Sequence, residues 1–127
     1  QIKIDCDVIQ ADGGTRTASI SGGFVSLFLA IEKLKNNYNI EKPIIKKYIG
    51  AISAGIIDGK PLLDLDYEED SAAQVDANFV ICDTGEISEI QATGEEFFFN
   101  DEQFFKMFDL AKIGVKKIID SQKEMLG

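Results

Sequence analysis

Residues 12–19, with the sequence DGGTRTAS, lie between an alternating segment at residues 2–9 and a long apolar pattern that runs to about Leu34. The two glycines allow a sharp turn and let a ligand approach the backbone without meeting a Cβ. The hydroxyl side chains fall where a helix begins, and the first N–H groups of a helix lack internal partners and bind anions readily. Arg16, the only arginine of the chain, adds a guanidinium suited to phosphate.

The same motif is also typical of a plain capped turn between a strand and a helix, with Arg16 in solvent. Short glycine motifs often match by chance. Residue spacing alone therefore leaves two interpretations open, an anion site and a structural turn.

Composition bounds what the chain can do. Its 127 residues, 45% of them hydrophobic, are enough for one domain or one and a half small ones. No run of about 18 apolar residues occurs, from which we exclude a membrane span and expect no membrane partner. The absence of histidine excludes Ser-His and Cys-His catalysis, and two cysteines without histidine exclude a zinc site. We expect Cys6 and Cys82 to be buried free thiols, as in a reducing compartment such as the cytoplasm.

Charge is divided unevenly along the chain. Residues 1–63 carry 8 Lys and Arg against 6 Asp and Glu, whereas residues 64–127 carry 5 against 16. The net charge of −9 argues against a general basic surface for nucleic acid. A nucleic-acid function would therefore need metal ions or positive charge from elsewhere.

Periodicity predicts a mixed set of helices and strands. We expect a strand at 2–9, which already begins at the first residue and suggests that something upstream has been removed. A helix follows to about residue 34, and a polar connection at 39–43 is the best domain boundary. Beyond it we expect strands at 48–57, 61–67, 77–82 and 86–92, a helical turn at 70–74 capped by Asp70, and a last helix opened by a capping box of Asn100 and Gln103.

An acidic cluster marks residues 64–76. If 61–67 is a strand, Asp64 and Asp66 lie on one face of it, with Asp70 placed to fold back beside them. Aspartate is a poor strand former, and crowded carboxylates repel one another unless a cation or proton intervenes. Oxygen ligands of this kind suit Mg²⁺ or Mn²⁺, although an acidic solvated strand is the more common explanation of such a run.

The run DCDVIQADGGTRTASI at residues 5–20 resembles the signature of the ribonuclease PH family of bacterial phosphate-dependent 3′→5′ exoribonucleases. Further matches are LDLDYEEDSAA at 63–73, DANFV at 76–80 and SQK at 121–123. These motifs are long and follow the family's order, and the resemblance covers essentially the whole chain. It corresponds to the C-terminal half of the family's subunit.

The resemblance implies a role for each motif. Gly14, Thr15 and Arg16 would hold inorganic phosphate as the co-substrate. Asp64 and Asp70 would be the catalytic carboxylates, binding Mg²⁺ or Mn²⁺ or giving a proton to the leaving 3′-oxygen, and Asp66 or Asp76 would support them. The substrate would be the 3′ end of a tRNA precursor, and the product a nucleoside diphosphate.

The resemblance also implies an α+β fold and a larger assembly. Residues 1–42 would be the end of a truncated unit like domain 2 of ribosomal protein S5, and residues 43–127 the small αβ C-terminal domain of the family. Members form a homo-oligomeric ring of six, and the N-terminal half that carries further basic residues is missing from this sequence. The alternative is an inactive structural or assembly domain that acts with a partner carrying that half.

Overall fold

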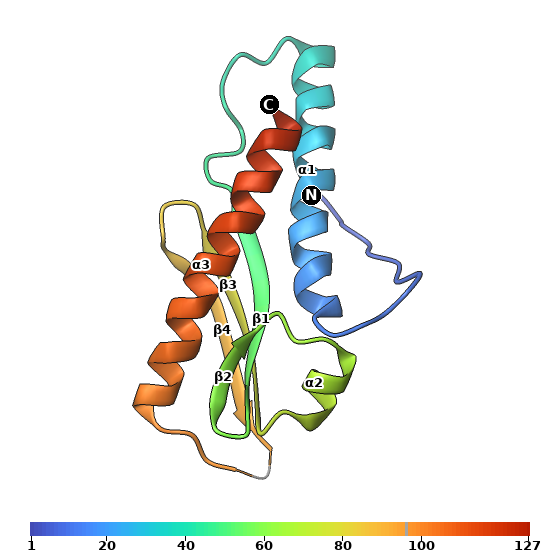
Figure 1. The fold of residues 1–127 in the computed structure, drawn as a ribbon. Helices are drawn as coiled ribbons and strands as arrows, with labels where there is room; N and C mark the ends of the chain where they lie inside the picture. Colours follow the sequence, from blue (N-terminus) through green and yellow to red (C-terminus); the bar gives the residue numbers. More distant parts are fainter. Residues whose placement is uncertain (96) are drawn as a thin grey trace.

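The computed structural model describes residues 1–95 and 97–127. Within them lie α1 (Thr15–Tyr38), β1 (Ile49–Ile57), β2 (Lys60–Leu63), α2 (Tyr67–Ala72), β3 (Val75–Cys82), β4 (Ile87–Gly94) and α3 (Asp101–Leu126). The strands form one antiparallel four-stranded sheet in the order β2-β1-β3-β4 (Figure 1). The α+β class expected from the sequence is confirmed, whereas the domain boundary at residue 42 stays a prediction.

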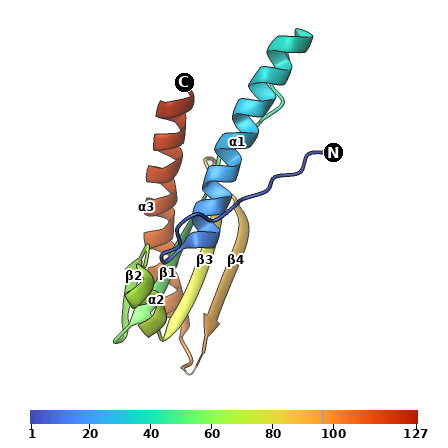
Figure 2. The same ribbon diagram turned by 90° about the vertical axis from the view of Figure 1, so that its right-hand side faces the viewer.

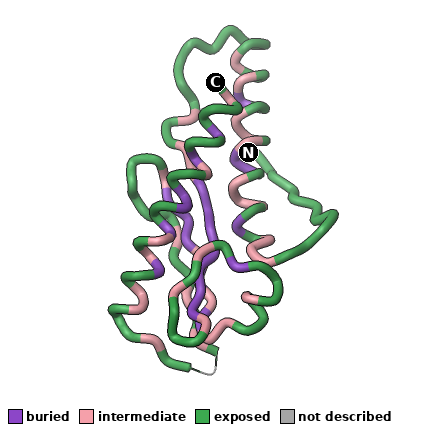
Figure 3. Tube along the Cα trace, viewed as in Figure 1, coloured by how far each residue is buried: buried purple, intermediate pink, exposed green. Residues whose placement is uncertain are grey.

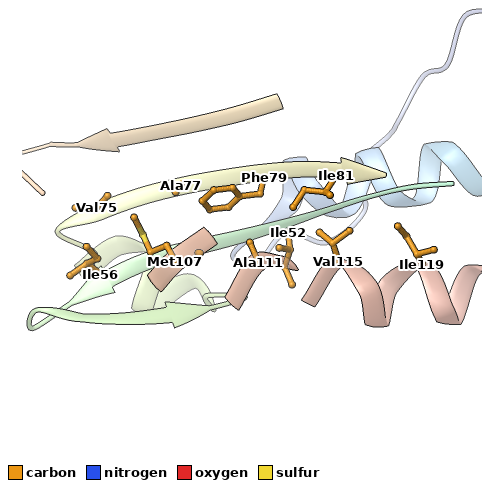
Figure 4. Packing of buried hydrophobic residues seen from close by; sticks show 11 residues of the cluster. Ile52, Ile56, Val75, Ala77, Phe79, Ile81, Met107, Ala111, Val115 and Ile119 are labelled. Atoms are coloured by element: carbon orange, nitrogen blue, oxygen red, sulfur yellow. The ribbon is translucent and has the colours of Figure 1, made fainter. Parts of the chain in front are cut away.

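One face of the sheet packs against α3 and forms the core. Alternate residues of β1 and β3 point to this face, because side chains of a strand alternate between its two sides. They meet residues spaced four apart along α3 (Figure 4): Met107, Ala111, Val115 and Ile119. Phe79, at the centre, is fully buried. Phe104 and Phe108 of α3 are partly buried and pack against the same core.

The other face of the sheet lies towards α1, on the side opposite α3 (Figure 2). Ser21 of α1 fixes this contact, since its Oγ accepts a hydrogen bond from Ala51 N at 3.0 Å. Gln122 of α3 is 4% exposed, and its Nε2 donates to the carbonyls of Ser21 and Ile49, both at 3.1 Å. This one side chain therefore ties both long helices to the first strand.

Two short sequence signals form as predicted. Asp58 and Gly59 close the β1–β2 hairpin with φ of 49° and 74°, the left-handed pair that a two-residue turn needs. Asn100 caps α3, accepting from Gln103 N at 2.9 Å, while the Gln103 side chain accepts from Asn100 N at 3.0 Å. Both the hairpin turn and the helix cap are determined by residues only a few positions apart.

The predicted strand at residues 2–9 is wrong. This segment is extended and exposed, and it runs outside the sheet beside α1 (Figure 3). A strand needs a neighbour to take up its N–H and C=O groups, and no described strand lies next to it. Both cysteines are free as predicted, but Cys6 on this segment is exposed and Cys82 is only half-buried.

Helix α1 is long and apolar enough, by length and composition, to cross a membrane. The exclusion based on an uninterrupted apolar run was therefore too strong. One such helix is weak evidence, because the core helix of a soluble protein passes the same test. In this structure Phe24 and Ile31 of α1 are buried in the protein.

Candidate active site

The turn before α1 packs directly on the segment that follows β2. A Cβ on Gly13 would lie 2.0 Å from the carbonyl oxygen of Leu65, so only glycine fits there. Asp12 joins the two segments as well, because its Oδ1 accepts hydrogen bonds from Gly13 N at 2.8 Å and from Tyr67 N at 2.7 Å. The glycine turn and the acidic segment, which are far apart in the sequence, are therefore held against each other.

The N-terminus of α1 opens towards these two segments. Gly14 is the N-cap, with φ of 72° and no side-chain cap. The hydroxyl of Thr15 donates to Asp12 O at 2.8 Å, and that of Thr17 donates to Gly14 O at 2.9 Å. Because these hydroxyl hydrogens are used on backbone carbonyls, the donors left for an anion are the first N–H groups of the helix.

Arg16 lies beside this helix end and is paired with an acid. Its Nη2 is 2.8 Å from Oε1 and 3.0 Å from Oε2 of Glu89 on β4. Both side chains are about half exposed, which makes the pair a weak contributor to stability. One carboxylate holds one end of the guanidinium, so an anion at the helix N-terminus meets an arginine whose position is already set.

The predicted acidic strand face does not form. Strand β2 ends at Leu63, and Asp64 adopts the left-handed region with φ of 56° while its N–H donates to Ser53 O at 2.8 Å. Leu65 turns inward and is 1% exposed. Asp64 and Asp66 therefore do not share a strand face, in keeping with the low strand preference of aspartate.

Asp66 instead caps α2. Its Oδ1 accepts from Glu69 N at 2.9 Å, and the Glu69 carboxylate accepts from Asp66 N at 3.1 Å. The expectation of a helical turn capped by Asp70 is wrong, because the capping box starts the helix four residues earlier. Asp66 thus has a structural role that occupies its carboxylate.

A cavity of about 370 Å³ brings together most of the remaining predicted residues. It is lined by the predicted phosphate-site residues Gly14, Thr15 and Arg16, by the three acids Asp12, Asp70 and Asp76, and by the polar side chains Ser53, Asn78 and Gln91. Asp64 lies at its edge: a Cβ on Gly14 would be 3.9 Å from Asp64 Oδ1. An arginine, a helix N-terminus and acids therefore surround one space.

Asp76 differs electrostatically from the other acids. Partial burial raises the pKa of its carboxyl above the usual range, and the carboxylates of Asp70 and Glu95 raise this pKa further. Asp76 and Asp70 thus repel one another across the cavity, which is the situation that a cation or a proton relieves.

The raised pKa of Asp76, caused first by burial and then by repulsion, predicts a pH-dependent stability for Asp76→Asn. An acid whose pKa is raised on folding is destabilising once ionised, so its effect is absent below the unfolded pKa of about 3.9 and grows as the pH rises through the folded pKa. In metal-free buffer, Asp76→Asn should raise the free energy of unfolding at pH 7, and the gain should shrink towards pH 4. Urea unfolding at both pH values measures it, with the exposed Asp5→Asn as control. An equal gain at both pH values would contradict the electrostatic explanation.

The acids of this site suit a Mg²⁺ ion that is bound partly by water and substrate phosphates, rather than one enclosed by protein ligands alone. Among residues 1–95 and 97–127, no three acidic or cysteine side chains gather closely enough to hold a metal ion on their own. Mg²⁺ commonly keeps several waters and is bound by one or two carboxylates together with substrate phosphates. Asp70 and Asp76 supply such a pair, and Asp64 lies nearby.

The family follows from comparison with known proteins. Residues 47–114, more than half of the chain, match domain 2 of the 3′ exoribonuclease family. The chain belongs to this family.

Particular relatives agree with this assignment. The chain is similar to ribonuclease PH of Syntrophomonas wolfei, with 50% identity over 124 residues that cover 98% of the chain and 52% of the relative. Ribonuclease PH of Bacillus pumilus is 52% identical over 127 residues, covering 99% and 52%. The chain thus spans about half the length of these relatives, and its resemblance to the C-terminal half of ribonuclease PH is confirmed.

Solved structures support the fold. The "archaeoglobus fulgidus exosome with RNA bound to the active site" matches 68% of the chain and 35% of its own, with a TM-score of 0.54 and 12% identity. The "Archaeal exosome core" matches 70% of the chain and 37% of its own, with a TM-score of 0.56 and 14% identity.

Several site residues escaped the sequence analysis. Asp12 was recognised only as the first residue of the glycine motif and not for its contact with Tyr67. Glu89, which pairs with Arg16, has no local pattern that sets it apart from a surface acid. Ser53 had a usable signal, a lone hydroxyl in the apolar strand AISAG. Asn78 and Gln91 alternate with apolar neighbours, and this pattern could have placed them on the second face of the sheet.

Proposed function

We propose that this chain carries the phosphate-binding and acidic parts of a phosphorolytic 3′→5′ exoribonuclease that trims tRNA precursors. The observation that carries the proposal is the single cavity lined by Arg16, the start of α1 and the acids Asp70 and Asp76. Identity of about 50% to ribonuclease PH sequences supports the same activity.

The residues suggest how the reaction proceeds. The helix N-terminus and Arg16 hold inorganic phosphate, one oxygen of which attacks the phosphorus of the terminal phosphodiester. A new P–O bond forms, the bond to the 3′-oxygen of the preceding nucleotide breaks, and that oxygen takes a proton. The products are a nucleoside diphosphate and an RNA shorter by one nucleotide, and the reverse reaction adds nucleotides.

The acids have two tasks in this scheme. Asp64 and Asp70 are the catalytic carboxylates, each of which either gives a proton to the leaving 3′-oxygen, directly or through water, or binds the metal ion, and Asp76 supports them. Asp70 and Asp76 would hold Mg²⁺ or Mn²⁺, with Asp64 beside them, whereas Asp66 is committed to its cap. The ion, when bound, neutralises charge that develops at phosphorus.

A second candidate is a structural domain that acts with a partner carrying the N-terminal half of ribonuclease PH. The observation in its favour is apolar surface: Ile2, Val8 and Ile9 on the extended segment are exposed, as are Leu29 and Tyr38 on α1. A cavity of about 610 Å³ also lies between that segment and α1. A docked second half would cover such surface. The family resemblance also implies a ring of six subunits in the cytoplasm, and the contacts within that ring would cover more of it.

A release assay separates the two candidates. The chain is incubated with a 3′-tailed RNA and Mg²⁺, with and without inorganic phosphate, alone and together with the N-terminal half of a ribonuclease PH. Nucleoside diphosphate that appears only with phosphate supports the enzyme, and its appearance only after mixing supports the partner-dependent domain. Release of nucleoside monophosphate without phosphate would contradict phosphorolysis.

A further inference from the structure

Ser53 carries a buried hydroxyl without a partner. The residue is 2% exposed, and within residues 1–95 and 97–127 its Oγ makes no hydrogen bond. Its backbone carbonyl accepts a hydrogen bond from Asp64 N at 2.8 Å. A buried polar atom left unsatisfied costs free energy, and it is commonly explained by a function, such as binding a ligand or an ion.

The position of this hydroxyl is informative. Ser53 lines the cavity that also holds Arg16 and the start of α1. A Cβ on Gly14, the N-cap, would lie only 3.2 Å from Ser53 Oγ. The hydroxyl therefore lies directly beneath the helix end whose N–H groups are free to bind an anion.

A row of neutral polar side chains continues from Ser53 across the sheet. Ser53 of β1 is the register partner of Asn78 of β3, and Asn78 is the partner of Gln91 of β4. All three line the same cavity, on the face opposite the core. This floor supplies hydrogen bonds without adding charge.

The charge balance of the cavity explains why an anion bound there would need neutral hydrogen-bond donors. A phosphate dianion there gains one positive side chain, Arg16. It faces three acids that line the same cavity, Asp12, Asp70 and Asp76. Arg16 is in addition shared with Glu89. An anion in such surroundings depends on neutral donors, and Ser53 is the buried one.

We infer that the Ser53 hydroxyl donates a hydrogen bond to an oxygen of bound inorganic phosphate, which makes Ser53 a further substrate-binding residue of this site. The inference rests on the proposed function, because it names phosphate as the ligand. The other source of the same chemistry is the terminal phosphodiester of RNA, and the experiment separates the two.

The test is calorimetric titration of the whole chain with inorganic phosphate. Loss of a hydrogen bond to a charged group corresponds to a weakening of about tenfold or more, so Ser53→Ala should raise the Kd for phosphate by at least that factor. Ser88→Ala, which removes an exposed hydroxyl from β4, should leave the Kd unchanged. A short RNA without inorganic phosphate is titrated in parallel.

Thermal unfolding distinguishes binding from a structural role. Removing an unsatisfied buried hydroxyl should leave the Tm of the phosphate-free variant equal to or above that of the wild type. The rise in Tm produced by phosphate should shrink in Ser53→Ala, because a weaker ligand stabilises less. A lowered Tm without phosphate, together with an unchanged Kd, would overturn the inference.

The remaining outcomes separate this inference from the proposed function. If the wild type binds phosphate, Arg16→Ala does not and Ser53→Ala does, the phosphate site stands and the role of Ser53 is refuted. If Ser53→Ala weakens only RNA binding, the hydroxyl serves the phosphodiester and the inference is again wrong. If the wild type binds no phosphate at all, both proposals fail together.

Discussion

Arg16→Ala should weaken phosphate binding and lower the rate of phosphate-dependent nucleotide release by about 10²–10³-fold, the usual effect of removing one donor that stabilises developing charge. Arg16 is the only arginine of the chain and the only positive side chain among those lining the cavity. The helix N-terminus survives the change and accounts for residual binding. Calorimetry with inorganic phosphate and the release assay measure the two effects independently.

Two further variants serve as controls for Arg16. Arg16→Lys keeps the charge but loses the planar fork, so it should fall between the wild type and Arg16→Ala. Glu89→Gln removes the carboxylate that lies 2.8 Å from the guanidinium, and it should tighten phosphate binding because the anion no longer competes with an acid. Unchanged phosphate affinity in Arg16→Ala would exclude this residue from the anion site.

Asp70→Asn should reduce nucleotide release by about 10²–10⁴-fold, the range that a positioned acid contributes to proton transfer. Asp64→Asn should have a comparable effect, and it is compatible with the fold because asparagine tolerates the left-handed conformation that Asp64 adopts. The same release assay, run at saturating phosphate, measures both. Phosphate affinity should fall in neither variant, since each removes negative charge from around the anion.

A titration with Mg²⁺ then separates the roles of the two acids. A variant that has lost a metal ligand recovers activity as the Mg²⁺ concentration rises, whereas one that has lost the proton donor does not. Glu68→Gln on the exposed side of α2 is the matched control and should retain full activity. Full activity in Asp70→Asn would remove this residue from the mechanism.

The sequence predicts best the elements that are determined by neighbouring residues. The Asp58-Gly59 hairpin and the capping box of Asn100 and Gln103 formed as expected, because each depends on side chains only a few positions apart. The strand at 2–9 failed for the opposite reason. Its alternation is clear, but a strand exists only beside another strand, and the described sheet offers none at that place.

The candidate site was predicted in its parts rather than in its arrangement. The turn at 12–19 and the acids of 64–76 were both recognised, and the cavity brings Arg16 to Asp70. The prediction for the acidic cluster was partly wrong. Periodicity places Asp66 beside Asp64 on a strand face, whereas in the structure Asp66 is the N-cap of α2. Glu89 could not be assigned, because its importance arises from a contact across 73 residues of chain, whereas Ser53 had a signal in its apolar neighbours that was not used.

The hydrogen bond from Tyr67 N to Asp12 bridges 55 positions of sequence, and one of the two from Gln122 reaches back 101 positions to Ser21. Contacts of such range form late, because the entropy of closing a long loop must be overcome before they contribute. The turn at 12–19 can therefore pack on residues 65–67 only once that later segment has been synthesised. A nascent chain that has exposed Arg16 but not yet β1, β3 and β4 lacks the side chains of Ser53, Asn78 and Gln91 that line the cavity, which delays any activity until those strands have been made.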